Sequence, residues 1–286
     1  MNQSFKPAGV RTAAPHLGIL LTLACGMTAP AATIYVWQQS PTPAPPFATW
    51  ESAAHSLQDA VDAAAAGDEV VATNGVYATG GRAVFGTMTN RVAVNKPLLV
   101  RSVNGAQETI IQGRQAPGGG IGVGAIRCVY LAEGAVLHGF TLTNGATSGM
   151  GTDVPERSGG GVLCASTNAL VSHCTLVSNA ASFGGGGAYS GTLSNCALIG
   201  NWSFDGGGAY ESILKNCALT ANSAYRDGGG ACRSELTHCT VTGNSADNGG
   251  GVAGGRAAHC ILYYNTAPSS SQANNAQWYS SGIGAS

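Results

Sequence analysis

The chain of 286 residues is 44% hydrophobic and only 9% charged, with 43 glycines and a net charge of −1. Its 13 lysines and arginines are scattered and form no basic stripe, which argues against nucleic acid as a partner. The hydrophobic fraction and a strict internal repeat argue against a disordered chain. We therefore expect one elongated domain.

The N-terminus, residues 1–31, has the pattern of a signal peptide. Lys6 and Arg11 precede an apolar run from Leu17 to Met27, which is too short to span a bilayer. Ala29-Pro30-Ala31 then supplies small residues for cleavage. We expect a bacterial protein that is secreted or held at the cell surface, with no transmembrane segment in the mature chain.

Two alternatives for this segment are weaker. A buried N-terminal helix is disfavoured because Pro15 and Pro30 bracket the apolar run. A lipoprotein is disfavoured because Thr22 stands where an aliphatic residue is expected before Cys25.

Residues 32–95 predict a helix followed by irregular strands. Ser56–Asp68 fits an amphipathic helix, since Leu57 and Val61 lie four residues apart on one face and Gly67 can end it. Strands are expected at Glu69–Thr73 and Arg91–Arg101.

Residues 96–267 contain a repeat of 21 or 22 residues. Five cysteines recur at intervals of 22, 21, 22 and 21, and each is followed five positions later by an asparagine. A glycine tract lies in each repeat, as at Gly206–Gly208. A repeat this short cannot bury its own apolar side chains, so its copies must stack as coils of a solenoid. The ladder positions are Cys174, Cys196, Cys217, Cys239 and Cys260, with Asn179, Asn201, Asn222, Asn244 and Asn265.

Within one repeat the pattern is that of a half-buried strand. In Leu214-Lys-Asn-Cys217-Ala-Leu219 the cysteine and the leucine two places on share the inward face, and the residue between them is small. The run also fits the front half of a leucine-rich repeat. Three consecutive glycines break the helix that such a repeat can contain, at about 1 kcal/mol each, but they suit turns with positive φ. The pattern therefore favours a parallel β-helix.

GGGAY combined with C-x-L-x-x-N resembles the repeat of right-handed parallel β-helix proteins in the pectin-lyase-like superfamily. It is similar to the polymorphic outer membrane protein repeats, which pair GGA with F-x-x-N. The resemblance covers about Gly159 to Ala267 and extends more loosely back to Ile34. It implies an all-β fold in which the helix at 56–68 caps the first coil. It implies little about function, because this superfamily mixes lyases, hydrolases and adhesins.

The repeat is imperfect at both ends. In Leu137–Asn144, Phe140 takes the cysteine position, but Asn144 follows it after four residues instead of five. An insertion, Ala146–Ser158, precedes the next coil. At the other end residues 268–286 form a polar tail, so the chain is expected to be a fragment or to fold this tail over its last coil.

Stacked coils place equivalent cysteines about 4.8 Å apart with parallel side chains. That arrangement strains a disulfide, so a ladder of buried thiols is the expectation. Disulfides and metal binding are the alternatives. Cys164 and Cys232 fall outside the ladder and are the expected reactive pair. The asparagine ladder is expected to satisfy turn backbone groups.

Asp205, Asp227 and Asp247 recur beside the glycine tracts, with Arg226 and Arg233 close by. A column of carboxylates suits Ca²⁺, which takes oxygen ligands, and with a basic proton acceptor it resembles the arrangement of lyases that act on acidic polysaccharides. Against this, aspartate before glycine is ordinary turn chemistry, and Asp247 is offset by one position.

Two further pairs are expected on neighbouring coils. Tyr189 and Tyr210 either face outward, where they suit sugar rings, or lie in the core, which is favoured because Cys232 takes that position in the next coil. His238 and His259 are expected on a solvated face, since two imidazoles are too few for a metal site.

The outward positions are mostly Ser, Thr, Ala and Asn, without a dense charged cleft. The main expectation is therefore an exported, non-enzymatic scaffold that binds a glycan or a cell-envelope component and needs no cofactor. The alternative is a polysaccharide lyase or glycoside hydrolase acting on an acidic polysaccharide. It would use Asp205, Asp227, Arg226 and Arg233, with Ca²⁺ as the cofactor.

Overall fold

The computed structural model describes residues 30–149, 153–268 and 278–279. The predicted signal peptide, residues 1–31, falls almost entirely outside the described residues, as do most of the tail 268–286 and Cys25. In the described ranges no helix is long and apolar enough to cross a membrane.

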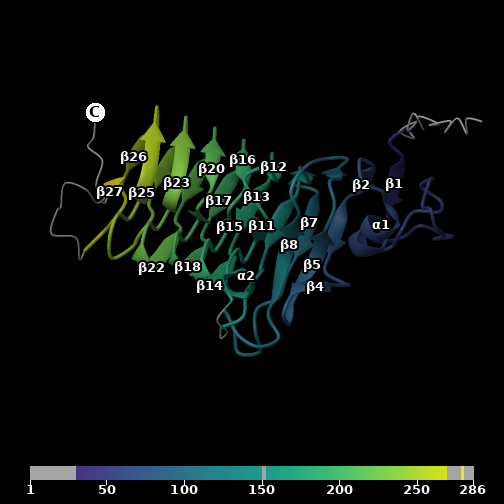
Figure 1. Cartoon of the computed structure of the whole chain (residues 1–286), viewed down its shortest axis with the longest axis horizontal. Coiled ribbons are helices and arrows are strands. Elements are labelled where there is room, and N and C mark those ends of the chain that lie inside the picture. Colours follow the sequence, from purple (N-terminus) through teal and green to yellow (C-terminus); the bar gives the residue numbers. More distant parts are fainter. Residues whose placement is uncertain (1–29, 150–152, 269–277, 280–286) are drawn as a thin grey trace, which may run out of the picture. The chain divides into compact units, whose positions relative to one another are not determined.

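The chain folds as a right-handed parallel β-helix with a short N-terminal helix, which confirms the predicted fold class. Figure 1 shows its strands stacked coil upon coil in chain order, from β1 (Thr33–Val36) to β26 (Ile261–Tyr263). The regular repeats contain strands and turns without helix, so the leucine-rich repeat alternative is wrong.

The strands form three sheets. The large sheet has two columns of strands that meet at β23 (Ala231–Thr237). One column contains β1, β2 (Glu69–Ala72), β6 (Leu99–Ser102), β9 (Val136–His138), β12 (Leu170–Ser172), β16 (Thr192–Ser194) and β20 (Ile213–Lys215). The other contains β4 (Arg82–Phe85), β5 (Met88–Val94), β8 (Ile126–Leu131), β11 (Val162–Cys164), β15 (Ala188–Tyr189) and β19 (Ala209–Tyr210), and β25 (Val252–Ala258) and β27 (Trp278–Tyr279) follow β23.

The other two sheets close each coil. The eight-stranded sheet contains β3 (Gly75–Tyr77), β7 (Thr109–Gln112), β10 (Thr141–Thr143), β13 (Thr175–Val177), β17 (Ala197–Ile199), β21 (Ala218–Thr220), β24 (Thr240–Thr242) and β26. The three-stranded sheet contains β14 (Ala180–Gly184), β18 (Trp202–Asp205) and β22 (Ser223–Asp227). All the pairings between named strands are parallel, except the β4–β5 hairpin.

The coils turn at residues with left-handed backbone. The residue before each ladder cysteine is one of them, as at Asn216 with φ of 54°. It divides the expected continuous strand around Cys217 into two strands, β20 and β21, although Leu214, Cys217 and Leu219 all stay inside. Asparagine and histidine tolerate this conformation better than most residues. This row of corner residues is His173, Asn195, Asn216, His238 and His259.

A second row of left-handed corners explains the misfit at Asn144. Thr143 pairs with Val177, and Asn144, with φ of 57°, takes the corner position that Ser178 occupies in the next coil. Gly145 then stands at the ladder position, where its N–H donates to Asn179 Oδ1 at 2.8 Å. The apparent four-residue spacing is therefore a glycine in place of the ladder asparagine.

The ladder asparagines are buried and bond from coil to coil. Asn222 Oδ1 accepts from both the backbone N–H and Nδ2 of Asn201, at 3.0 and 2.9 Å. Asn222 Nδ2 donates to Leu198 O and to Asn244 Oδ1, both at 2.9 Å. Each amide thus pairs backbone groups that the turn would otherwise leave buried and unpaired.

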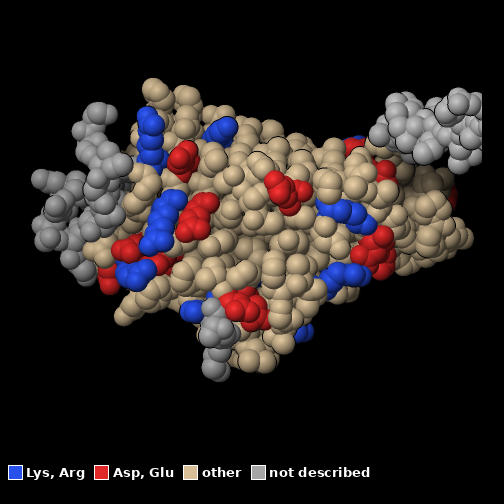
Figure 2. Space-filling model, in the orientation of Figure 1, with Lys and Arg blue, Asp and Glu red and all other residues tan. Residues whose placement is uncertain are grey.

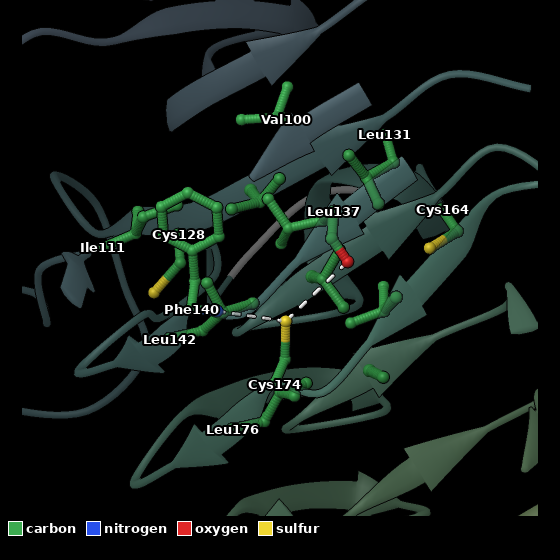
Figure 3. Packing of buried hydrophobic residues seen from close by; sticks show 14 of the residues in the cluster. Val100, Ile111, Cys128, Leu131, Leu137, Phe140, Leu142, Cys164, Cys174 and Leu176 are labelled. Atoms are coloured by element: carbon green, nitrogen blue, oxygen red, sulfur yellow. Dashed lines mark hydrogen bonds between the residues drawn. The ribbon is translucent and has the colours of Figure 1, made fainter. Parts of the chain in front are cut away.

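The thiols lie in the apolar core and donate to the coil before them. Cys196 Sγ contacts Val171 O at 3.4 Å, and Cys217 Sγ contacts Leu193 O at 3.6 Å. Figure 3 shows Phe140 one coil before Cys174, whose Sγ accepts from the Phe140 N–H at 3.4 Å. The eight described cysteines are free, and all but Cys260 are buried.

The helix α1 (Leu57–Ala63) packs against β1, β2 and β5 at the first coils. Ser56 caps it by accepting from the Asp59 N–H at 3.1 Å, and Leu57 and Val61 are buried as predicted. The helix ends at Ala63, before Gly67, because Ala64 is already extended.

The insertion carries a second, four-residue helix, α2 (Val154–Arg157). It is held by Arg127 of β8, which is fully buried and donates to Pro155 O within the helix and to Ser158 O just after it, the latter at 2.8 Å. Arg127 also donates to Asn90 Oδ1 of β5 at 2.7 Å. Burial lowers the Arg127 pKa to about 9, so its charge persists at neutral pH.

At the C-terminal end the described part of the tail returns to the last coil. Trp278 and Tyr279 form β27, which pairs in parallel with Val252 and Ala253 of β25. This pairing extends the large sheet by one strand.

Replacing Asn222 with Ala is expected to lower the free energy of unfolding by about 3 kcal/mol, because several buried donors and acceptors lose their partners together. Urea denaturation measures this. Asn216→Gly is the matched control in the same coil. Asn216 is exposed, and glycine accepts its left-handed backbone, so about 0.5 kcal/mol or less is expected. Equal effects of the two substitutions would contradict the role of the ladder.

Thiol labelling tests the burial of the cysteines. Burial raises the pKa of Cys128 and of Cys164 to about 12, so neither forms much of the reactive thiolate at about pH 8. In a Cys25→Ala background we expect only the partly exposed Cys260 to react rapidly in the native protein, and Cys260→Ala to abolish that phase. Rapid native labelling of several thiols would contradict the buried ladder.

Candidate functional site

A hollow of about 350 Å³ lies on the outer face of the large sheet, near its C-terminal end. It forms where one row of equivalent side chains, read from coil to coil toward the C-terminus, changes from large to small. Tyr210 pairs in register with Cys232, and Cys232 pairs with Ala253. The residues that line the hollow are Arg226, Asp227, Cys232, Arg233, Asn248, Ala253 and Gly254.

Tyr189 and Tyr210 belong to this row and lie outside the main core of the coils. Tyr210 is buried, as expected, in a separate hydrophobic cluster with Cys232 and Ala253, against which Tyr189 packs. Their neighbours Ala188 and Ala209 fill the core, so strand alternation turns the tyrosines outward. The two rings stack at 5.6 Å with an angle of 10°. Tyr210 is nevertheless only 2% exposed, because Phe183 and Arg233 pack against it on the outside.

Arg226 joins two of the predicted acidic residues. Its Nε lies 3.0 Å from Asp205 Oδ1 and 3.1 Å from Asp227 Oδ2, and its Nη2 bonds Asp205 Oδ2. The Asp205 hydrogen bond raises the Arg226 pKa, so this guanidinium remains charged. The guanidinium carbon also lies 5.0 Å from the centre of the Phe204 ring. The Arg226 side chain is half exposed, whereas Asp205 is buried.

The acidic column differs from the predicted one. Asp205 pairs in register with Asp227, and Asp227 pairs with Asn248, so Asn248 occupies the third position. Asp247 lies one residue before that position. Asn248 Nδ2 donates to Asp227 Oδ1 at 3.1 Å. Asp205 and Asp227 each directly precede a glycine tract, and so does Asn248. Aligning the coils on the glycine tracts would therefore have identified Asn248 from the sequence.

This column does not fit calcium. Both oxygens of Asp205 bond to Arg226, and Asp227 is shared between Arg226 and Asn248. Among the described residues no group of three or more His, Cys, Asp or Glu side chains is placed to hold a metal ion. Ca²⁺ takes six to eight oxygens, and this arrangement does not offer them.

Arg233 reaches the hollow from the corner that follows Cys232. Its backbone is left-handed, with φ of 50°, as is that of Glu211 one coil earlier. Arg233 Nη1 lies 3.8 Å from Glu211 Oε1, and its side chain is 64% exposed. Tyr189 O–H donates to the other carboxylate oxygen of Glu211 at 3.2 Å. Arg233 is thus loosely held, in contrast to Arg226.

Cys164 and Cys232, the expected reactive pair, lie in different parts of the structure and do not contact one another. Cys164 packs in the main core, whereas Cys232 belongs to the outer cluster with Tyr210. Burial raises the pKa of Cys232 to about 12, and the nearby carboxylates add to the effect. Both thiols are therefore protonated at neutral pH and neither is an activated nucleophile.

The histidines lie where they were expected. His238 and His259 are exposed at a corner on neighbouring coils, with ring centres 5.2 Å apart and planes 13° apart. They are separate from the hollow.

The outer face carries both signs of charge. Figure 2 shows acidic and basic side chains beside one another over the C-terminal coils, at the left of the view, rather than a patch of one sign. The hollow is therefore lined by individual guanidinium groups and does not lie in a broad basic field.

Known structures of the same fold resemble this chain. A pectate lyase, Pel9A, superposes with a TM-score of 0.52 at 11% identity, over 82% of this chain and 65% of the lyase. Pectin methylesterase PemA from Erwinia chrysanthemi gives 0.43 at 11% identity over 75% of this chain and 66% of its own. A rhamnogalacturonan lyase gives 0.40 at 14% identity, over 81% and 62%. At these identities the likeness shows the fold alone. This chain spans about two thirds of the pectate lyase. No family model and no curated protein matches the sequence.

Replacing Arg226 with Ala leaves the buried Asp205 carboxylate without its cation, so we expect a loss of about 2 kcal/mol in the free energy of unfolding. Adding Asp205→Asn removes the buried charge and should restore part of that loss. Arg233→Ala is the control, because its ion pair with Glu211 is exposed and long, and about 0.5 kcal/mol or less is expected. The free energy of unfolding is measured by urea denaturation. An unchanged value in Arg226→Ala would contradict this account.

Proposed function

We propose that the protein binds an acidic polysaccharide, with one anionic sugar unit in the hollow between Arg226 and Arg233. The observation that carries the proposal is a pair of exposed guanidinium groups lining one hollow on the outside of a rigid sheet. An exposed guanidinium such as that of Arg233 matches the planar carboxylate of a sugar acid with two parallel hydrogen bonds. Arg226 already bonds Asp205 through Nε and Nη2, so it adds positive charge and a single further donor, Nη1. A volume of about 350 Å³ falls at the lower end of the range for small-ligand sites.

The two arginines have different parts in this proposal. Arg226 is held by Asp205 and Asp227, so its orientation is set before a ligand arrives. Such preorganisation reduces the entropy lost on binding. Arg233 has only the distant Glu211 as its acidic partner, at 3.8 Å, and an incoming carboxylate replaces that contact easily. Most of the net attraction therefore comes from Arg233.

Cleavage of the bound polymer is the second candidate function. It is favoured by the likeness in fold to a solved pectate lyase. The hollow offers no activated base in Cys232, whose pKa is raised, or in Arg226, which Asp205 keeps protonated. A catalytic site would therefore have to use Asp227 or Arg233. Binding is the function that the geometry supports best, and an exported protein, as the N-terminal pattern predicts, would meet such polymers outside the cell.

Binding is tested by titrating the protein with polygalacturonate. Arg233→Ala is expected to weaken binding about tenfold or more, since a charged hydrogen bond to the ligand is lost, and added salt should weaken the wild type. Arg256→Ala is the matched control, because Arg256 is exposed on β25 and does not line the hollow.

Absence of wild-type binding to polygalacturonate and to other uronic-acid polymers would contradict the proposed function. Absorbance of the unsaturated product, followed with and without added Ca²⁺, separates cleavage from binding. A rise that is lost in Arg233→Ala would establish the second candidate.

A further inference from the structure

Three aromatic side chains project from the outer face of the three-stranded sheet. Trp202 and Phe204 come from β18, and Tyr225 comes from β22. We call these three residues the aromatic shelf. Trp202 is 40% exposed and Tyr225 is 64% exposed, while the intervening Ser203 is fully buried. Strand alternation therefore places the small residue inside and the large rings outside, the reverse of what burial of apolar surface favours.

Two of the three rings of the shelf are ordered by mutual contacts. The rings of Phe204 and Tyr225 stack at 5.3 Å with an angle of 27°, and the Arg226 guanidinium lies 5.0 Å from the centre of the Phe204 ring. Exposed apolar surface that is held in place but contributes nothing to a core marks an interaction site.

The shelf is continuous with the hollow through one side chain. Arg226 packs on Phe204 and also lines the hollow, so the two surfaces meet at the edge of the three-stranded sheet. Beside the rings the row that contains Trp202 continues with Ser223 and then Ser245, both partly exposed. Aromatic faces flanked by hydroxyls suit the C–H faces and hydroxyl groups of sugar rings.

We propose that the aromatic shelf is a second contact surface for the same sugar chain and takes the uncharged ring faces of units next to the one in the hollow. This inference rests on the proposed function and specifies which further residues select a polymer over a single sugar. A protein partner is disfavoured, because three side chains on two coils supply far less than the roughly 800 Å² per partner of a stable protein interface.

The test compares polygalacturonate with galacturonic acid as probes. Trp202→Ala and Tyr225→Ala are each expected to weaken binding of the polymer about tenfold, because large aromatic contacts dominate such surfaces. Binding of the monomer should be unchanged, since it occupies only the hollow. Tyr264→Ala is the matched control, as Tyr264 is 81% exposed and lies off the shelf. Tryptophan fluorescence gives a second readout. We expect polymer binding to change the fluorescence of the wild type and to leave that of Trp202→Phe unchanged.

The outcomes separate the inference from the function on which it rests. If the wild type binds polymer and Arg233→Ala weakens binding while both shelf substitutions leave it unaltered, the shelf is not a contact surface and the hollow stands. If no form binds the polymer, the proposed function itself fails. Equal loss of polymer and monomer binding in Tyr225→Ala would also overturn the inference, because it would show a general effect on the hollow.

Discussion

The structure depends on exact stacking of equivalent residues at the corners of successive coils. A corner buries backbone groups that no sheet can pair, and the asparagine ladder pairs them with the coils above and below. A shift of one residue would remove every one of these bonds and turn the core side chains outward. The register enforced inside therefore also fixes the rows on the outside, including the row in which Cys232 and Ala253 follow Tyr210.

The outer face shows how a regular scaffold acquires a local site. Along one row tyrosines give way to cysteine and alanine, and a hollow opens, while the left-handed corner that follows the row recurs at Glu211, Arg233 and Gly254. Both arginines stand beside strands or corners that the ladders hold in place. Arg226 further connects the hollow to the aromatic rings of the neighbouring sheet. A polymer bound across the edge of the three-stranded sheet would contact the charged hollow with one part of its length and the aromatic shelf with the next.

Much of the fold could be predicted because the period of the sequence is the period of the structure. The spacing of cysteine and asparagine predicted rows of equivalent residues on stacked coils, with the cysteines inward, and the glycine tracts favoured a β-helix. The left-handed corners were missed, because Leu214–Leu219 was interpreted as one continuous strand. A tyrosine and a cysteine in one row suggested the main core for Tyr210, whereas this row forms a separate hydrophobic cluster outside it. Asp247 was preferred to Asn248 on residue type, although the backbone register decides which side chain joins the column.

The site could be predicted only in part, because it depends on which side chains meet across coils. Asp205, Asp227 and Arg226 were singled out, but their mutual pairing, which occupies the carboxylate oxygens that a calcium site would use, followed only from the structure. The most direct measurement is a crystal structure with a bound oligogalacturonate. The account predicts a sugar carboxylate between Arg226 and Arg233. A sugar bound on another face, with this hollow unaltered, would contradict it.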